Sequence, residues 1–330
     1  MKTEVNKKPK TWIFSIANLQ QGAKSYFLLT AVTLSLLSCS DSILDVTTEV
    51  QNQFENIEVI EVDAGFLDVS YTGINEETRV NLDGLIRANS DAYKIVYEVE
   101  GEVLKIKVVR NGGGRIGNFR SEGRITLTGP KQIELKLEAG SGNVMAKNVS
   151  SEVIELKVGS GRVELFDASA DFIELDASSG KISAGNLQGR VQAIVSSGSI
   201  TMQDVKGDID LECTSGRLTL SYIDGLVNAH ASSGKIELNR VNYLGKLTLS
   251  SGQISVAQSG LCSFTYLKAS SGNITVQTST NLSEYNYDLV SGSGKVRVGD
   301  RQASGVLRIE NGAPYTIKGE VNSGKIEITN

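Results

Sequence analysis

The chain has 330 residues and is mildly acidic, with 33 basic residues, 38 acidic residues, one histidine and a net charge of −5. Because many of the lysines lie before residue 40, the rest is more acidic still, and it shows no basic patch of the kind that nucleic-acid binding requires. Three cysteines are too few for a disulfide scaffold, so we expect a core that is held by apolar packing.

Residues 1–39 are predicted to be a lipoprotein signal peptide outside the fold. A basic start precedes an apolar run at 26–37, which is too short to span a bilayer and has the form of a secretory signal. The sequence Leu36-Leu37-Ser38-Cys39 resembles the bacterial lipobox, in which the cysteine is lipidated and becomes the mature N-terminus. We therefore expect a covalent lipid on Cys39, no other cofactor, and an outer-membrane lipoprotein of the cell envelope that faces the periplasm or the surface.

Residues 40–53 are polar and lack a strand period, which predicts a tether between the lipid and the domain. Residues 54–132 are β-rich but irregular, with strands expected at 93–99 and 102–109 around Gly101. A stack of repeats needs a cap over its first unit, because an open strand edge pairs with other chains. We expect 54–132 to be that cap and 54–330 to be one domain.

Residues 112–117 formally match G-x-G-x-x-G, the glycine pattern of dinucleotide sites. Such a site needs a helix directly after the motif, whereas a strand-like segment follows at 124–127. We therefore interpret the motif as a flexible loop between strands.

From residue 133 onward the chain repeats a Ser-Gly pair, and successive glycines are 19, 19, 18, 18, 18, 18, 20, 22 and 30 residues apart. Apolar residues stand two and four positions after each glycine and five before every glycine except the last, with polar residues between them. This period of two is typical of strands, since a helix would need 3.6. It predicts that Ile200 and Leu211 point inward and that Lys235 and the single histidine, His230, point outward. The glycines are Gly142, Gly161, Gly180, Gly198, Gly216, Gly234, Gly252, Gly272, Gly294 and Gly324.

The pattern predicts an all-β fold: a right-handed parallel β-solenoid of about ten coils with an 18–22-residue repeat over 133–330 and an irregular β-rich N-terminal cap. Glycine suits the Ser-Gly corner because it reaches positive φ without a Cβ penalty. The last step contains an insertion at about 299–316, which we expect to fold over the end of the stack before the final strand.

A second corner lies six residues after each glycine, where the first four repeats place Asn148, Asp167, Asn186 and Asp204. Such side chains can bind calcium, but Tyr222 ends the run and the glycine-aspartate nonapeptide of calcium-binding β-rolls is absent. We interpret the column as turn residues and expect no metal site.

The candidate binding residues are aromatic. Tyr243 and Tyr285 stand nine residues before their glycines, and Phe264 and Tyr266 lie on the coil between them. Aligned rings could stack on sugars or anchor a protein partner, and the alternative is that they pack under the longer loops. Polysaccharide lyases with parallel β-helices gather carboxylates with arginine or lysine in a lateral groove. Here the charges are spread over outward columns, so we expect no enzymatic activity.

The Ser-Gly ladder, the β-rich opening at 54–59 and the ending at 322–328 resemble the head GIN domain family, candidate auto-transporter adhesins that are often secreted or lipid-anchored in Bacteroidetes. The resemblance covers about 54–330 and implies a β-solenoid and an adhesin role, with no catalytic residues to transfer. We expect a non-catalytic adhesin or envelope binding module that contacts the membrane through its lipid and binds an envelope glycan or surface protein. The alternative is a carbohydrate-binding or carbohydrate-active β-helix protein that uses a lateral aromatic face.

Overall fold

The computed structural model describes residues 46–88, 91–110 and 121–330. The chain divides into a unit of residues 1–41 and a unit of residues 42–330, and every described residue belongs to the second unit. Cys39, the first part of the predicted tether and the glycine-rich motif at 112–117 lie outside the described residues.

The described residues are nearly all in β-strands, which join into one 14-stranded sheet. No α-helix occurs within the described ranges, and no helix there is long and apolar enough to cross a membrane. A short 3-10 turn, η1, spans Leu282–Glu284. The strands are β1 (Val46–Glu55), β2 (Val59–Asp63), β3 (Asp68–Ile74), β4 (Arg79–Ala88), β5 (Tyr93–Glu100), β6 (Val103–Arg110), β7 (Ser121–Pro130), β8 (Glu134–Lys206), β9 (Ile209–Ser259), β10 (Leu261–Thr278), β11 (Asn286–Val298), β12 (Arg301–Ala303), β13 (Val306–Ile309) and β14 (Thr316–Thr329).

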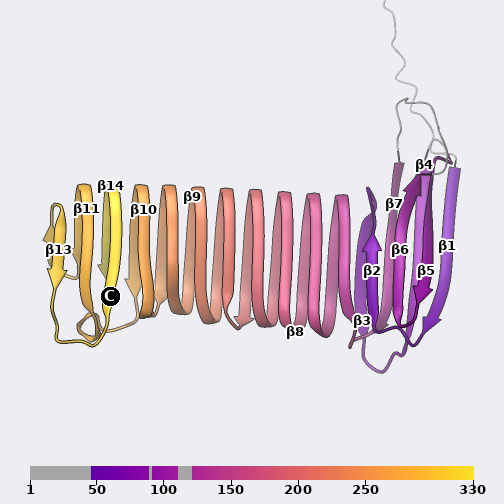
Figure 1. Ribbon diagram of the computed structural model, residues 1–330, viewed down its shortest axis with the longest axis horizontal. Helices are drawn as coiled ribbons and strands as arrows, with labels where there is room; N and C mark the ends of the chain where they lie inside the picture. The colour runs from indigo at the N-terminus through magenta and orange to yellow at the C-terminus, as the bar shows by residue number, and fades with distance from the viewer. Residues whose placement is uncertain (1–45, 89–90, 111–120) are drawn as a thin grey trace, which may run out of the picture. The chain divides into compact units, whose positions relative to one another are not determined.

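The repeats stack on one another in parallel. The long strands β8, β9 and β10 bend through successive coils, and each coil pairs with the next (Figure 1). The pairing places glycine opposite glycine, with Gly198 beside Gly216 and Gly252 beside Gly272. The predicted solenoid-like stack of Ser-Gly repeats is therefore confirmed.

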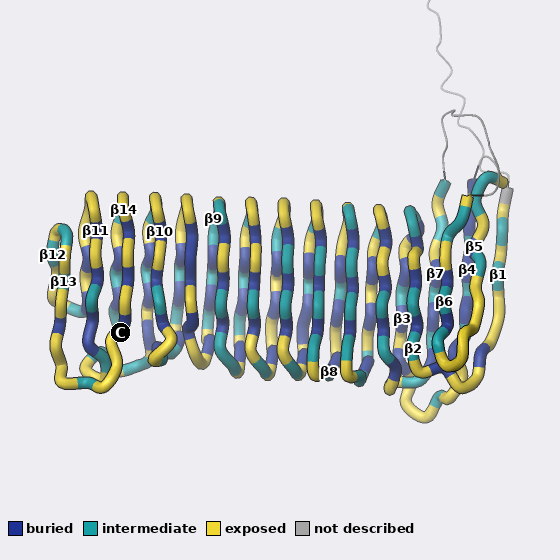
Figure 2. Tube along the Cα trace, in the orientation of Figure 1, coloured by how far each residue is buried: buried dark blue, intermediate teal, exposed yellow. Residues whose placement is uncertain are grey.

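The predicted inward columns form the core. Figure 2 shows buried and exposed bands alternating along every coil, as a strand period of two requires. Ile200 and Leu211 are buried, His230 is exposed, and Lys235 is half-buried on the outer surface, where it pairs with Glu237 at 2.5 Å. The column two residues after each glycine is fully buried throughout: Val144, Val163, Ile182, Ile200, Leu218, Ile236, Ile254, Ile274, Val296 and Ile326.

The Ser-Gly corner requires glycine for two reasons. Gly234 has φ +125, a conformation that residues with a Cβ rarely adopt. A Cβ on Gly234 would also lie 1.8 Å from the carbonyl oxygen of Gly216 on the coil below. Because that neighbour is backbone, it cannot move aside without breaking the stack.

The second corner is a left-handed turn on each coil from the one that carries Asn148 to the one that carries Gln258. Asn148, Asp167, Asn186 and Asp204 have φ between 54 and 56, and Tyr222 has φ 58. The Asn148 amide donates to the carbonyl oxygen of Gly73 at 2.7 Å, and the Asn186 amide donates to Asp167 Oδ1 at 2.8 Å. Asparagine and aspartate tolerate this conformation best, so the interpretation as turn residues agrees with the backbone.

The strands β1 to β7 form the cap at the start of the stack. One ladder runs β5-β6-β2 onto β8, and a second runs β1-β4-β7-β3 onto β8. The predicted hairpin around Gly101 is present as β5 and β6. Residues 46–53, which we predicted as tether, instead lie in β1 and pair antiparallel with β4. As an edge strand β1 has one solvated side, so its sequence carries little of the apolar period that marks inner strands.

The opposite end differs from the prediction in strand order. β12 and β13 pair antiparallel with β11 and close that end of the stack, as expected of the insertion. The final strand β14, however, lies between β10 and β11, with Gly324 paired to both Gly272 and Gly294. Every coil carries the same columns, so the repeat predicts that β14 stacks but not which neighbours it takes.

The register makes a quantitative prediction. Leu211→Asp places an unpaired carboxylate in the core and should lower the free energy of unfolding by several kcal/mol. Lys235→Asp changes the outer surface and loses one exposed ion pair, so it should cost about 1 kcal/mol or less. Thermal melts of the two variants measure the difference, and equal melting temperatures would contradict the register.

Candidate functional site

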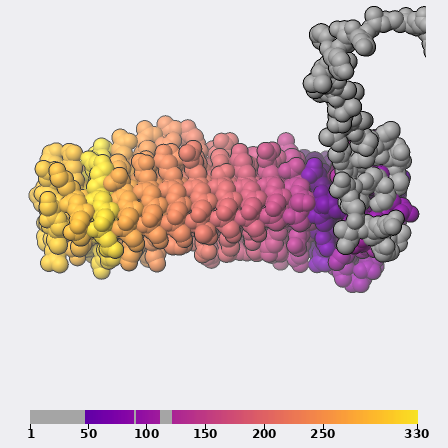
Figure 3. Space-filling model, turned by 90° about the horizontal axis from the view of Figure 1, so that it is seen from above, coloured from indigo at the N-terminus to yellow at the C-terminus, as the bar shows by residue number. Residues whose placement is uncertain are grey.

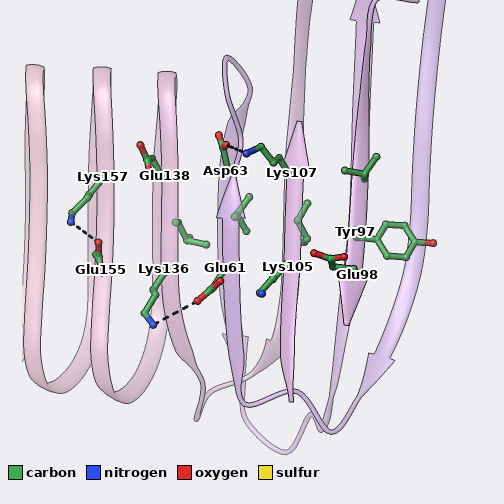
Figure 4. Close-up of a pocket in the computed structure, with 14 residues that line it drawn as sticks. Glu61, Asp63, Tyr97, Glu98, Lys105, Lys107, Lys136, Glu138, Glu155 and Lys157 are labelled. Carbon is green, nitrogen blue, oxygen red and sulfur yellow. Dashed lines mark ion pairs between the residues drawn. The ribbon is translucent and has the colours of Figure 1, made fainter. Parts of the chain in front are cut away.

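A shallow groove of about 510 Å³ lies on the face formed by β5, β6, β2 and the first coils of β8 (Figure 4). We call it the charged groove. Its ionisable lining residues are Glu61, Asp63, Glu98, Lys105, Lys107, Lys136, Glu138, Glu155 and Lys157.

Lysines and carboxylates in the charged groove neutralise one another. Lys107 pairs with Asp63 at 3.2 Å, and Lys136 pairs with Glu61 at 3.7 Å. Hydrogen bonds that Lys157 donates to the Glu155 carboxylate, and then to the Glu174 carboxylate, raise the pKa of Lys157. Partly exposed pairs of this kind add little stability each, and the lysines here serve as partners of the carboxylates rather than as free groups. Within the described residues, no group of three histidine, cysteine or acidic side chains could hold a metal ion.

A second groove, of about 490 Å³, follows the left-handed corners of β8 and β9. Its lining combines the turn residues Asn148, Asp167, Asn186 and Asp204 with Tyr222. The Tyr222 ring is 51% exposed and carries the guanidinium of Arg240 at 5.0 Å from its centre. The residues that line this polar groove lie between 131 and 224, so they precede Tyr243, Phe264 and Tyr285 in the sequence.

The most exposed large apolar side chain of the described residues is Phe264, at 71%, and Tyr243 on the preceding coil is 53% exposed. Both rings therefore satisfy the first requirement of a binding surface. Phe264 lies in a bulge, because the pairing of β10 with β9 shifts register between Leu261 and Tyr266. The 20-residue step from Gly252 to Gly272 supplies the extra residues.

Buried hydrogen bonds hold this bulge in one conformation. The Thr265 hydroxyl, only 3% exposed, donates to the carbonyl oxygen of Leu244 at 2.6 Å and accepts from the backbone N–H of Cys262 at 2.9 Å. The Cys262 thiol also lies 3.2 Å from the Leu244 carbonyl oxygen. These hydrogen bonds fix the backbone beside the exposed Phe264 ring. Binding of a partner to this ring therefore costs little backbone conformational entropy. The two described cysteines, Cys213 and Cys262, are not joined by a disulfide.

The other two predicted rings are half-buried. The Tyr285 hydroxyl donates to the Leu261 carbonyl oxygen at 3.2 Å, and burial raises the pKa of this phenol. Tyr266 lies on the outer sheet face between Lys246 and Lys318, directly after the bulge, and burial followed by the nearby Glu320 raises its pKa. Tyr285 thus supports the corner through packing.

Tyr315 was missed by the sequence reasoning. It is 54% exposed and precedes β14, where the backbone N–H of Asn286 donates to its carbonyl oxygen at 2.9 Å, so it adjoins Tyr285. Tyr315 stands nine residues before Gly324, the same spacing as Tyr243 and Tyr285, and that spacing was the available signal. We call Tyr243, Phe264, Tyr285 and Tyr315 the aromatic corner.

Comparison with known proteins places this architecture in a family. The family model described as Toastrack DUF4097 matches residues 57–242 and 227–329. No curated protein matches the chain. This family differs by description from the head GIN family that the sequence resembles, and that finer resemblance stays a prediction.

Several solved structures are similar over most of their length. A candidate adhesin of Parabacteroides distasonis is 14% identical, with 86% of this chain and 97% of that chain covered and a TM-score of 0.39. A candidate lipid-binding protein of the same species is 16% identical, with coverages of 87% and 98% and a TM-score of 0.35. A candidate adhesin of Bacteroides fragilis is 12% identical, with coverages of 85% and 97% and a TM-score of 0.35.

Proposed function

The chain belongs to the Toastrack DUF4097 family, and we propose that it is a non-catalytic binding module of the bacterial cell envelope that acts as an adhesin. It binds an envelope glycan or surface protein through the aromatic corner and needs no cofactor. The proposal takes the solenoid as right-handed with about ten coils, as the repeat predicts.

The observation that carries this proposal is the display of Phe264. A 71%-exposed phenylalanine on a bulge that is fixed by the buried Thr265 hydroxyl is costly to keep in water and is the kind of anchor that binding surfaces use. Tyr243 and Tyr315 extend the ring surface on neighbouring coils. The paired charges of the charged groove favour binding over acid–base chemistry as the role of this protein.

The lipobox-like sequence at 36–39 supports a location in the cell envelope. We propose that Cys39 carries a lipid that anchors the protein in the outer membrane, with residues 40–45 as the remaining tether before β1. Anchoring would hold many copies on one surface, which raises the avidity of a weak individual contact.

The binding prediction uses residues 46–330, which keep β1, against arrays of immobilised glycans and an extract of envelope proteins. Combined Tyr243→Ala and Phe264→Ala changes should weaken binding of whichever ligand is captured by about tenfold or more, because two central rings are lost. The melting temperature should change little, because both rings are exposed.

Two matched variants test whether binding depends on how the Phe264 ring is held or only on the presence of exposed aromatic rings. Thr265→Val keeps the shape of the side chain but loses the bond to the Leu244 carbonyl, so it should weaken binding although Phe264 remains. Phe166→Ala removes an exposed ring elsewhere on β8 and should leave binding unchanged. Equal binding by the parent chain and the double variant would refute the aromatic corner as the binding surface.

The anchor prediction concerns Cys39→Ala in the full-length chain. The variant should lose lipidation, so it should leave the detergent phase on partitioning and lack the mass of a mature lipoprotein. Unchanged partitioning together with an unchanged mature mass would contradict the lipid anchor.

A further inference from the structure

The last strand of the chain occupies an interior place in the stack. β14 pairs in parallel with β10 on one side and with β11 on the other, although β11 precedes it in sequence. Figure 3 shows the yellow C-terminal strand between the orange coils of β10 and β11. The chain must therefore leave a slot one strand wide between these two coils, which its own C-terminus then fills.

The length of the preceding loop fits this slot. The step from Gly272 to Gly294 is 22 residues, whereas coils that stack directly on one another have steps of 18 to 20. The additional residues fall at 279–285, around η1, where the chain crosses from β10 to β11 over two strand spacings instead of one. The slot is thus set by β10, β11 and this loop, none of which belongs to β14.

We propose that this slot is an interaction site for a second copy of this chain, and that β14 exchanges between copies. The β14 of one molecule fills the slot of its partner and the reverse, which gives a closed two-fold dimer joined at the ends that carry β11 and β13. Exchange recovers every backbone hydrogen bond of β14, because the donated strand has the same sequence and register. The dimer lies beyond the proposed adhesin function and does not depend on it.

The connecting segment is long enough for exchange. Residues 310–315 join β13 to β14, and six extended residues span up to about 20 Å. If two molecules meet with their β13 edges one strand spacing apart, the partner's slot lies three spacings from the end of β13, about 14 Å sideways. The connection within one molecule crosses two spacings, so both forms are within reach.

Hydrogen bonds from Asn286 hold the connecting segment in the unexchanged form. Its Oδ1 accepts from the backbone N–H of Asn311 at 2.8 Å, and its side-chain amide donates to the carbonyl oxygen of Ala313 at 2.7 Å. Asn286 therefore restrains residues 310–315, which must change position for β14 to exchange.

The coil that flanks the slot on its outer side is weakened. The hydroxyls of Tyr287 and Ser291 in β11 are buried, and neither has a hydrogen-bond partner among the described residues. An unpaired buried hydroxyl costs folding free energy. β11 is thus suited to open and admit a strand.

The test uses cysteine pairs in full-length chains that fold together in one cell. Asn273 on β10 and Lys325 on β14 are paired neighbours and both are exposed. Chains with Asn273→Cys are co-expressed with chains that carry Lys325→Cys, and a short bismaleimide is added. Exchange should give a mixed covalent dimer, identified by mass spectrometry of the peptide that joins positions 273 and 325. Asn286→Ala in both chains should increase its yield.

Two controls make each outcome decisive. A single chain with both changes must cross-link within itself, which shows that the positions are reactive. Ser199→Cys and Arg217→Cys on separate chains occupy the equivalent pair of interior coils, which cannot exchange, and should give no mixed dimer. The proposal is overturned if the double variant cross-links while the 273–325 mixed dimer does not exceed this background, with and without Asn286→Ala.

Discussion

Close approach of one Ser-Gly corner to the next is the constraint on which this structure depends. At Gly234 a Cβ would lie 1.8 Å from the carbonyl oxygen of Gly216, so only a residue without a side chain lets the coils meet at the strand spacing. Once the corners stack, the positions on either side are forced into register. The column that contains Ile200 and Leu218 then becomes a continuous buried ladder, and the alternate positions form the solvated surface.

A stack of equivalent coils leaves little to distinguish one place on its surface from another. Distinct features therefore arise where the repeat departs from 18 residues. The 20-residue step adds the bulge that presents Phe264, the 22-residue step adds the loop that ends at Tyr285, and the 30-residue step brings Tyr315. The aromatic corner and the place of β14 between β10 and β11 thus lie at the same end of the stack, because both arise from these irregular steps.

Sequence reasoning predicted the stacked repeats and their core columns, but not the strand order at the ends of the stack. The inward columns and the exposure of His230 follow directly from the period of two. The place of β14 did not follow, because its apolar columns match every coil equally well and only loop lengths decide its neighbours. β1 was missed because an edge strand with polar residues lacks the inner-strand pattern. In the site, the exposure of Tyr243 and Phe264 agrees with a binding surface, whereas the Tyr285 phenol turns inward to the Leu261 carbonyl, a contact that no spacing encodes.

The central claim is that the coils can stack at the strand spacing only because each Ser-Gly corner carries glycine. The stability of Gly234→Ala tests this claim most directly. The added methyl must enter a backbone contact at φ +125, so the free energy of unfolding should fall by about 3 kcal/mol or more. Gly185→Ala is the matched control, because its Cβ would meet only the side chains of Phe166 and Gln203, at 3.3 Å, and these can shift. A large loss of stability for Gly234→Ala and a small one for Gly185→Ala is the predicted result in urea unfolding. Equal, small losses for both variants would contradict the account.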